Sequence, residues 1–176
     1  MRYSDSPSVE VDIHIDARPD RVWPLIADIN LPARFSTEFQ GAHWIDDSTG
    51  PAQGARFAGR NRHQATGEWE TTCTVTACEA GRLFAWAVGD PGFPSASWSF
   101  ELEPEGGGSR LRQRARMGPA PSGLTPAIEA MPDKEERIVA RRLAEFEANM
   151  LATLQGIKAL AEGADSTGSA EGAGSR

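Results

Sequence analysis

The sequence predicts a single α+β domain in which a strongly bent antiparallel sheet surrounds one long C-terminal helix. Three observations predict it: a strand-like alternation at residues 9–16, a series of short alternating runs over 41–117, and a helical apolar stripe over 139–161. The 176 residues, 39% of them apolar, supply one ordinary core. The expected domain organisation is an N-terminal extension at 1–8, one domain at 9–162 and a disordered tail at 163–176.

The first strand and two short helices open the domain. Apolar residues from Val9 to Ile15 alternate with charged and polar ones, which is typical of a strand with one buried face. Pro19 suits a first helical position, and apolar residues recur at helical spacing through 17–30. Residues 31–39 predict a second, shorter helix with Phe35 and Phe39 on one face.

Six further strands are predicted by alternating runs separated by turn residues. They lie around 42–47, 54–63, 67–79, 82–89, 95–104 and 108–117. With the first strand, the antiparallel sheet has seven strands.

A long helix follows a connection rich in proline and glycine at 118–132. Asp133 and Glu136 resemble a capping box, and apolar residues from Val139 to Ala161 share one face of a helix of about 29 residues. The tail beyond Gly163 consists mainly of small and polar residues, which bury too little surface to stay ordered.

Several segments carry a family resemblance: ARPDRVWPLIAD at 17–28, GARFAGRNR at 54–62, GRLFAW at 81–86, the isolated Trp98 and the final helix. With them, residues 9–161 resemble the START-like (SRPBCC) helix-grip superfamily in its polyketide cyclase/dehydrase-like branch. The resemblance implies the helix-grip fold. It does not fix the reaction, because members bind or transform lipids, hormones, polyketides and quinones.

Strand alternation gathers most of the aromatic residues on the inner face of the sheet, together with polar residues that need hydrogen-bond partners. A buried polar group without a partner costs about 1–3 kcal/mol, so this mixture predicts a cavity for a small, mostly apolar molecule. A plain aromatic core is the alternative. The predicted ligand-binding residues are Trp44, Phe57, Trp69, Thr71, Phe84, Trp86, Phe93, Trp98, Phe100, Gln113, Phe146 and Met150.

The predicted mouth of this cavity lies between the turn at 90–94 and the connection at 118–132. Both segments are rich in proline and glycine, and loops beside a binding site tend to be less stable than the scaffold. Phe93 is the one bulky apolar residue in the turn. It is therefore interpreted as a lid, with a plain contact to the long helix as the alternative.

His63 with Asn61 is the candidate catalytic pair, since a histidine transfers protons near neutral pH and an amide orients a carbonyl. His63 precedes a turn, so a solvated hairpin residue is the competing interpretation. The single tyrosine, Tyr3, precedes the first strand and offers no cavity hydroxyl. Cys73 is interpreted as a core residue.

Cys73 and Cys78 are expected on opposite faces of one strand, about 16 Å apart, and therefore unable to form a disulfide. Neither has the paired spacing of a zinc site, so no metal is expected. No sequence fingerprint of a nucleotide or dinucleotide cofactor occurs, and no cofactor is expected.

The net charge of −7 disfavours nucleic acid and anionic membranes as partners. Arginines at 110, 112, 114 and 116 form a local basic row, but the acids of the first strand, Glu10, Asp12 and Asp16, are expected opposite them. No stretch is apolar enough to span a membrane, and the first ten residues lack a signal-peptide core. A cytoplasmic location is expected.

Three functions are compatible with these patterns. The first is a binding domain for a small apolar or amphiphilic molecule that is polyketide-, lipid- or aromatic-like. The second is a polyketide aromatase/cyclase-type enzyme, in which His63 and Asn61 assist cyclisation and dehydration. The third is a protein-interaction module with a filled cavity. The sequence also leaves open whether the protein is a monomer or a homodimer.

Overall fold

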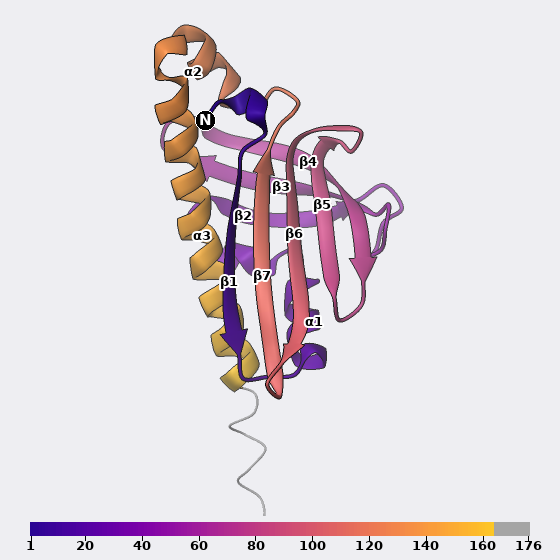
Figure 1. The fold of residues 1–176 in the computed structure, drawn as a ribbon. Helices are drawn as coiled ribbons and strands as arrows, with labels where there is room; N and C mark the ends of the chain where they lie inside the picture. The colour runs from indigo at the N-terminus through magenta and orange to yellow at the C-terminus, as the bar shows by residue number, and fades with distance from the viewer. Residues whose placement is uncertain (164–176) are drawn as a thin grey trace, which may run out of the picture.

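The computed structural model describes residues 1–163 and contains seven strands and one dominant helix (Figure 1). The strands are β1 (Ser8–Ile15), β2 (Phe39–Ile45), β3 (Arg56–His63), β4 (Gly67–Glu79), β5 (Leu83–Asp90), β6 (Phe93–Glu105) and β7 (Gly108–Met117). The helices are α1 (Pro19–Ile26), α2 (Thr125–Ala130) and α3 (Glu135–Gly163), with 3₁₀ turns η1 (Tyr3–Asp5), η2 (Leu31–Arg34) and η3 (Pro132–Lys134).

All strands form one antiparallel sheet in the order β1-β7-β6-β5-β4-β3-β2. The last strand lies beside the first, and the remaining strands follow as a meander. Figure 1 shows β1, β7 and β6 running alongside α3 while β2 and β3 cross behind them, so the sheet bends strongly around the helix. The predicted fold class, a curved seven-stranded sheet around a long C-terminal helix, is confirmed.

α3 has the 29 residues expected and packs along β1, while α1 covers its C-terminal part. From Met150 to Ala161 its buried residues recur at helical spacing, as an amphipathic helix requires. Opposite them lie fully buried residues of β1, β6 and β7. The largest buried side chains of this core are Ile15, Ile26, Phe84, Phe100, Leu102, Leu111, Met150, Leu154 and Ile157.

The predicted alternation fails in the middle of β4. Val75 pairs with Trp86 but Ala77 pairs with Ala85, so Thr76 is the extra residue of a β-bulge. The bulge reverses the facing of the side chains after it in β4. Cys78, opposite Phe84, packs against the core on the same side as Cys73, which corrects the expected opposite facing. Both cysteines are free.

The second predicted helix is shorter than expected. Only Leu31–Arg34 is helical, and Phe39 already belongs to β2. The hydroxyl oxygen of Ser36 accepts hydrogen bonds from the backbone N–H groups of Glu38 and Phe39, and this local turn replaces the helix. We call residues 35–38 the strap, because they cross α3 where the ring of Phe35 lies against Gly156.

The predicted neighbourhood of β1 and β7 is confirmed. Arg110 contacts Asp12 at 2.8 Å and Arg112 contacts Glu10 at 3.2 Å on the outer face of the sheet. Asp16 lies beside His14 instead of an arginine. The basic row is thus partly neutralised, as cross-strand pairing predicts.

The N-terminal extension is anchored to the domain. The hydroxyl of Tyr3 donates to the backbone oxygen of Ala120 at 2.7 Å, and its backbone N–H donates to Glu135 at 2.9 Å. Tyr3 therefore closes the N-terminal end of α3 and takes no part in the inner face. The predicted disordered tail lies, apart from Gly163, outside the described residues.

Candidate functional site

A cluster of aromatic side chains lies on the inner face of the sheet and reaches α3. Its centre is Trp86, whose ring stacks on Trp98 with centroids 6.2 Å apart and contacts the rings of Phe57, Phe84 and Phe100. Trp98 meets Phe146 of α3 at 4.9 Å, edge to face. We define the aromatic cluster as Trp44, Phe57, Phe84, Trp86, Trp98, Phe100 and Phe146.

The aromatic cluster is buried at one end and partly accessible at the other. Phe84 and Phe100 are 2% and 1% exposed, whereas Trp86, Trp98 and Phe146 are only half-buried. α3 shows the same gradient. Most apolar residues of its C-terminal half are buried, whereas Leu143 and Phe146 in its N-terminal half are only partly buried. The inner face is therefore a closed core near the C-terminus of α3 and a looser region near its N-terminal half.

Gln113 lies within this inner face with an unsatisfied oxygen. It is 5% exposed, and the backbone pairs it with Val11 on one side and Phe100 on the other. Among the buried side-chain nitrogen and oxygen atoms of residues 1–163, Gln113 Oε1 is the one without a hydrogen-bond partner. Such a group costs about 1–3 kcal/mol, so its presence in a core needs an explanation.

The other predicted polar residues have partners. The hydroxyl of Thr71 lies 3.4 Å from the backbone oxygen of Gly59 and 3.8 Å from the sulfur of Cys73. Burial raises the pKa of the Cys73 thiol to about 11, so the thiolate that a nucleophile requires is disfavoured.

Two further predicted ligand-binding residues lie outside the aromatic cluster. Trp69 lies opposite Asn61 on β3, and among the described residues no ring contact joins it to the aromatic cluster. Met150 is buried in the core.

Both ring nitrogens of His63 are engaged. The backbone N–H of Ala65 donates to Nδ1 at 3.2 Å, and Nε2 lies 3.5 Å from a carboxylate oxygen of Glu145 on α3. Nδ1 must therefore be the acceptor, and the proton lies on Nε2, facing Glu145. Asn61 donates to the backbone oxygen of Gly59 at 3.3 Å. The geometry ties His63 to α3, and the catalytic role of His63 and Asn61 stays a prediction.

His63 belongs to a larger set of polar contacts that sequence reasoning missed. Arg142 holds both carboxylate oxygens of Glu38 at 2.5 Å, with side chains 15% and 14% exposed. The side-chain oxygen of Asn149 accepts hydrogen bonds from the backbone N–H of Thr37 at 2.8 Å and from the hydroxyls of Ser36 and Thr37. We call these contacts, together with the pair His63–Glu145, the polar clasp.

The electrostatics of the polar clasp favour its charged forms. Burial alone would lower the pKa of Arg142, but the hydrogen bonds and charges of Glu38 and Glu145 outweigh it, and the pKa is raised. Burial alone would raise the pKa of Glu145, but hydrogen bonds from Arg142 and Arg141 lower it. Arg142 also lies over the ring of Phe146, 4.4 Å from its centroid, so the polar clasp covers the aromatic cluster.

The two segments of the predicted mouth, the turn at 90–94 and the connection at 118–132, are joined by hydrogen bonds along part of their length. The backbone N–H groups of Gly118 and Ala120 donate to the oxygens of Ser95 and Pro94 at 2.8 and 2.9 Å, so the two segments lie side by side. Phe93 is 52% exposed and pairs with Asp90, beyond the register shift at Ser95 that interrupts the alternation of β6. No ring contact among the described residues joins Phe93 to the aromatic cluster, and its role as a lid stays a prediction.

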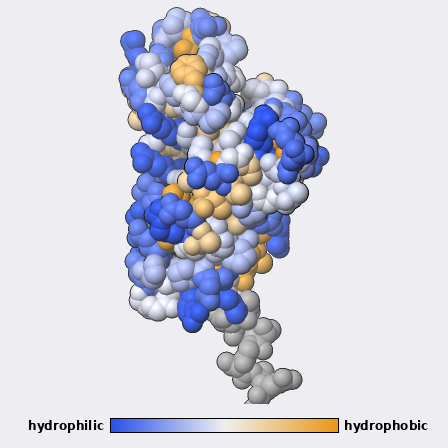
Figure 2. Space-filling model, turned by 90° about the vertical axis from the view of Figure 1, so that its right-hand side faces the viewer, coloured by the Kyte–Doolittle hydropathy of each residue, from blue (hydrophilic) through white to orange (hydrophobic). Residues whose placement is uncertain are grey.

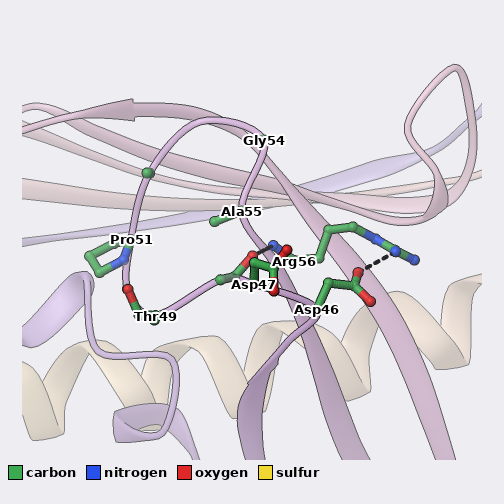
Figure 3. Close-up of a pocket in the computed structure, with 10 residues that line it drawn as sticks. Asp46, Asp47, Thr49, Pro51, Gly54, Ala55 and Arg56 are labelled. Atoms are coloured by element: carbon green, nitrogen blue, oxygen red, sulfur yellow. Dashed lines mark hydrogen bonds and ion pairs between the residues drawn. The ribbon is translucent and has the colours of Figure 1, made fainter.

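Two open depressions lie elsewhere on the surface. One, of about 620 Å³, is formed by the β2–β3 connection at residues 46–56, where Arg56 and Asp46 point toward one another (Figure 3). The other, of about 520 Å³, lies between residues 18–20 and the β6–β7 turn. Neither is lined by a residue of the aromatic cluster. Both are therefore surface features distinct from the inner face.

One side of the molecule exposes apolar surface between two hydrophilic flanks (Figure 2). Within residues 1–163, no helix is long and apolar enough to cross a membrane. The same residues contain no group of three or more His, Cys, Asp or Glu side chains arranged to hold a metal ion.

Comparison with known structures gives several similar folds. A Polyketide_cyc-like protein, Cgl2372 from Corynebacterium glutamicum, is 28% identical with a TM-score of 0.63, covering 94% of this chain and 97% of that one. TTHA0849 from Thermus thermophilus is 15% identical with a TM-score of 0.60, covering 90% of this chain and 99% of that one.

StfQ, a di-domain ARO/CYC from the steffimycin biosynthetic pathway, is 15% identical with a TM-score of 0.68. The match covers 90% of this chain and 52% of StfQ, so this chain spans about half of that protein. A search of curated proteins finds no match. Residues 6–155 match the family described as "Polyketide cyclase / dehydrase and lipid transport". That match covers most of the chain, and the chain therefore belongs to this family.

Proposed function

We propose that the protein binds a small molecule with an aromatic or otherwise apolar body and one hydrogen-bonding group, held between the inner sheet face and α3. The family and the helix-grip fold support a ligand-binding domain in general. The half-buried rings of Trp86, Trp98 and Phe146 supply apolar walls, since each Å² of apolar surface buried contributes about 25 cal/mol.

The observation that carries the proposal is the unpartnered Gln113 Oε1 beside the aromatic cluster. This oxygen is a hydrogen-bond acceptor to which no donor of the described residues is bonded. A hydroxyl or N–H group on an apolar ligand would satisfy it. Gln113 thus gives the site one polar point in an apolar lining, which is the usual composition of a small-molecule site.

The test compares two probes that differ in one hydroxyl group, 2-naphthol and naphthalene, by titration calorimetry or fluorescence. We expect the wild type to bind 2-naphthol about fivefold more tightly, the value of one neutral hydrogen bond of about 1 kcal/mol. Gln113→Met should remove this preference while still binding naphthalene. Gln155→Met, on the exposed face of α3, is the matched control and should change neither affinity.

Native mass spectrometry of protein purified from its own host is the complementary measurement, because a retained molecule would identify the ligand directly. Failure of the wild type to bind either probe, together with an empty native spectrum, would contradict the proposal. The aromatase/cyclase alternative has less support, since both ring nitrogens of His63 already have partners.

A further inference from the structure

Three sides of the region between the sheet and α3 are closed by apolar packing or by hydrogen bonds in which one partner is a backbone group. Along one side α3 packs directly on β1. At the N-terminal end of α3, Tyr3 is bonded to Glu135 and Ala120. At the C-terminal end, α1 packs on α3 and the ring of Phe35 lies against Gly156. Opening any of these sides would expose apolar surface or break the hydrogen bonds that anchor Tyr3.

The fourth side, between the N-terminal half of α3 and the strap, is closed by the polar clasp. Glu38 holds Arg142, Ser36 and Thr37 hold Asn149, and His63 faces Glu145. The residues Arg142, Glu145 and Asn149 are three and four positions apart, so they form one polar face of α3 turned toward the strap and β3. Behind this face lies the aromatic cluster, because Arg142 covers Phe146 and Phe146 contacts Trp98.

Polar contacts separate at lower cost than an apolar seam. Arg142 and Glu38 keep 15% and 14% of their side chains exposed, so water reaches both charges when the pair opens, whereas an opened apolar seam gains nothing from water. The polar clasp is thus the side of the region that opens most easily. We propose that it is the entrance through which an apolar ligand reaches the aromatic cluster. This inference rests on the proposed function, since it requires a ligand that enters.

The test measures rates by stopped-flow fluorescence with N-phenyl-1-naphthylamine, a neutral apolar probe. We expect Glu38→Gln to raise both the association and the dissociation rate constants about fivefold, with Kd changed less than twofold, because an entrance alters the barrier and not the bound state. Asn149→Ala should act in the same direction, and it decides the question if Glu38→Gln does not fold. Association to the wild type should also be faster at 1 M than at 0.1 M NaCl.

Two control variants separate this effect from general ones. Glu79→Gln removes the acid of the exposed pair Glu79–Arg82, which is the same chemical change far from the polar clasp, and should leave both rate constants unchanged. His14→Gln weakens contacts near the opposite end of α3 and should also leave them unchanged. Acceleration in either control would mean that the rates follow global stability, which would overturn the inference.

Other outcomes also overturn it. Acceleration by Phe93→Ala, with Glu38→Gln and Asn149→Ala at wild-type rates, would place the entrance at the β5–β6 turn. Weaker binding through dissociation alone in Glu38→Gln would make Glu38 a ligand contact. If the wild type binds neither this probe nor the naphthalene pair, the proposed function itself fails and the entrance falls with it.

Discussion

The ring of Phe35 packs directly against Gly156, and a β-carbon on Gly156 would lie well under 3.0 Å from its ring atoms. Gly156→Ala would ordinarily stabilise a helix interior by about 1 kcal/mol through propensity. Here the added methyl group collides with a ring that the strap holds in place. We expect a net loss of about 1–3 kcal/mol in the free energy of unfolding, typical of overpacking, measured by urea denaturation.

Gly163→Ala is the control for this prediction, since a β-carbon at Gly163 meets no atom within 4 Å. It should be neutral or slightly stabilising. A Gly156→Ala protein as stable as the wild type would show that the strap moves away without loss of stability. The close contact between Phe35 and Gly156 would then not be needed for stability.

The buried amide of Gln113 should limit stability. Gln113→Met keeps the length of the side chain and removes the unsatisfied oxygen, so we expect the free energy of unfolding to rise by about 1–2 kcal/mol. Gln155→Met, on the exposed face of α3, should change it by less than about 0.5 kcal/mol. A less stable Gln113→Met protein would mean that the amide already has a partner, such as a bound water molecule.

The sequence predicted the parts of the fold that depend on local pattern. The alternation in β1, β3 and β7 assigned the inner and outer faces correctly, and the spacing of apolar residues predicted α3. It failed at Thr76 because one extra residue in a strand leaves the neighbouring composition unchanged while reversing every later side chain. It also extended the second helix too far, since the turn around Ser36 depends on hydrogen bonds to Glu38 and Phe39.

In the candidate site, too, the sequence predicted the residues placed by local pattern and missed those brought together by the path of the chain. Trp86, Trp98 and Gln113 were found from alternation, because residues two apart on a strand share a face. The polar clasp was not found, because Glu38 and Arg142 are 104 residues apart and each reads as an ordinary surface charge. Only the path of the chain brings them together. A signal did exist in the polar residues at helical spacing on α3, Arg142, Glu145 and Asn149.

A pH-dependent contribution to stability is expected from His14. Its ring lies between Glu105, at 2.6 Å, and Asp16, at 2.9 Å, while Arg110 contacts the other oxygen of Glu105. The hydrogen bond to Glu105, then that to Asp16, raises the pKa of His14. A raised folded-state pKa means that the contribution is fully present below the ordinary histidine value of about 6.5 and is lost as pH rises through the raised value.

Glu105, the hydrogen-bond partner of His14, determines where this contribution to stability is lost on the acid side. The hydrogen bond from His14 is the largest cause that lowers the pKa of Glu105, so that share is lost as pH falls through the lowered value. We expect the difference in melting temperature between wild type and His14→Gln to be largest near pH 5.5 and to shrink toward pH 9. A difference that stays constant from pH 5.5 to 9 would contradict a charged His14 in the folded protein.

Trp98 distinguishes a ligand site from a plain aromatic core, because the two interpretations predict opposite results for Trp98→Ala. If the aromatic cluster binds ligands, the indole that stacks on Trp86 and meets Phe146 is a wall, and its removal should weaken binding of N-phenyl-1-naphthylamine about tenfold or more. If the aromatic cluster is a filled core, the wild type should bind no probe, while the variant gains an apolar cavity that binds benzene. Stability falls in both cases, by about 2–4 kcal/mol, so denaturation alone does not decide. Fluorescence titration with both compounds does, and benzene binding confined to the variant would leave the protein-interaction interpretation in place of the proposed function.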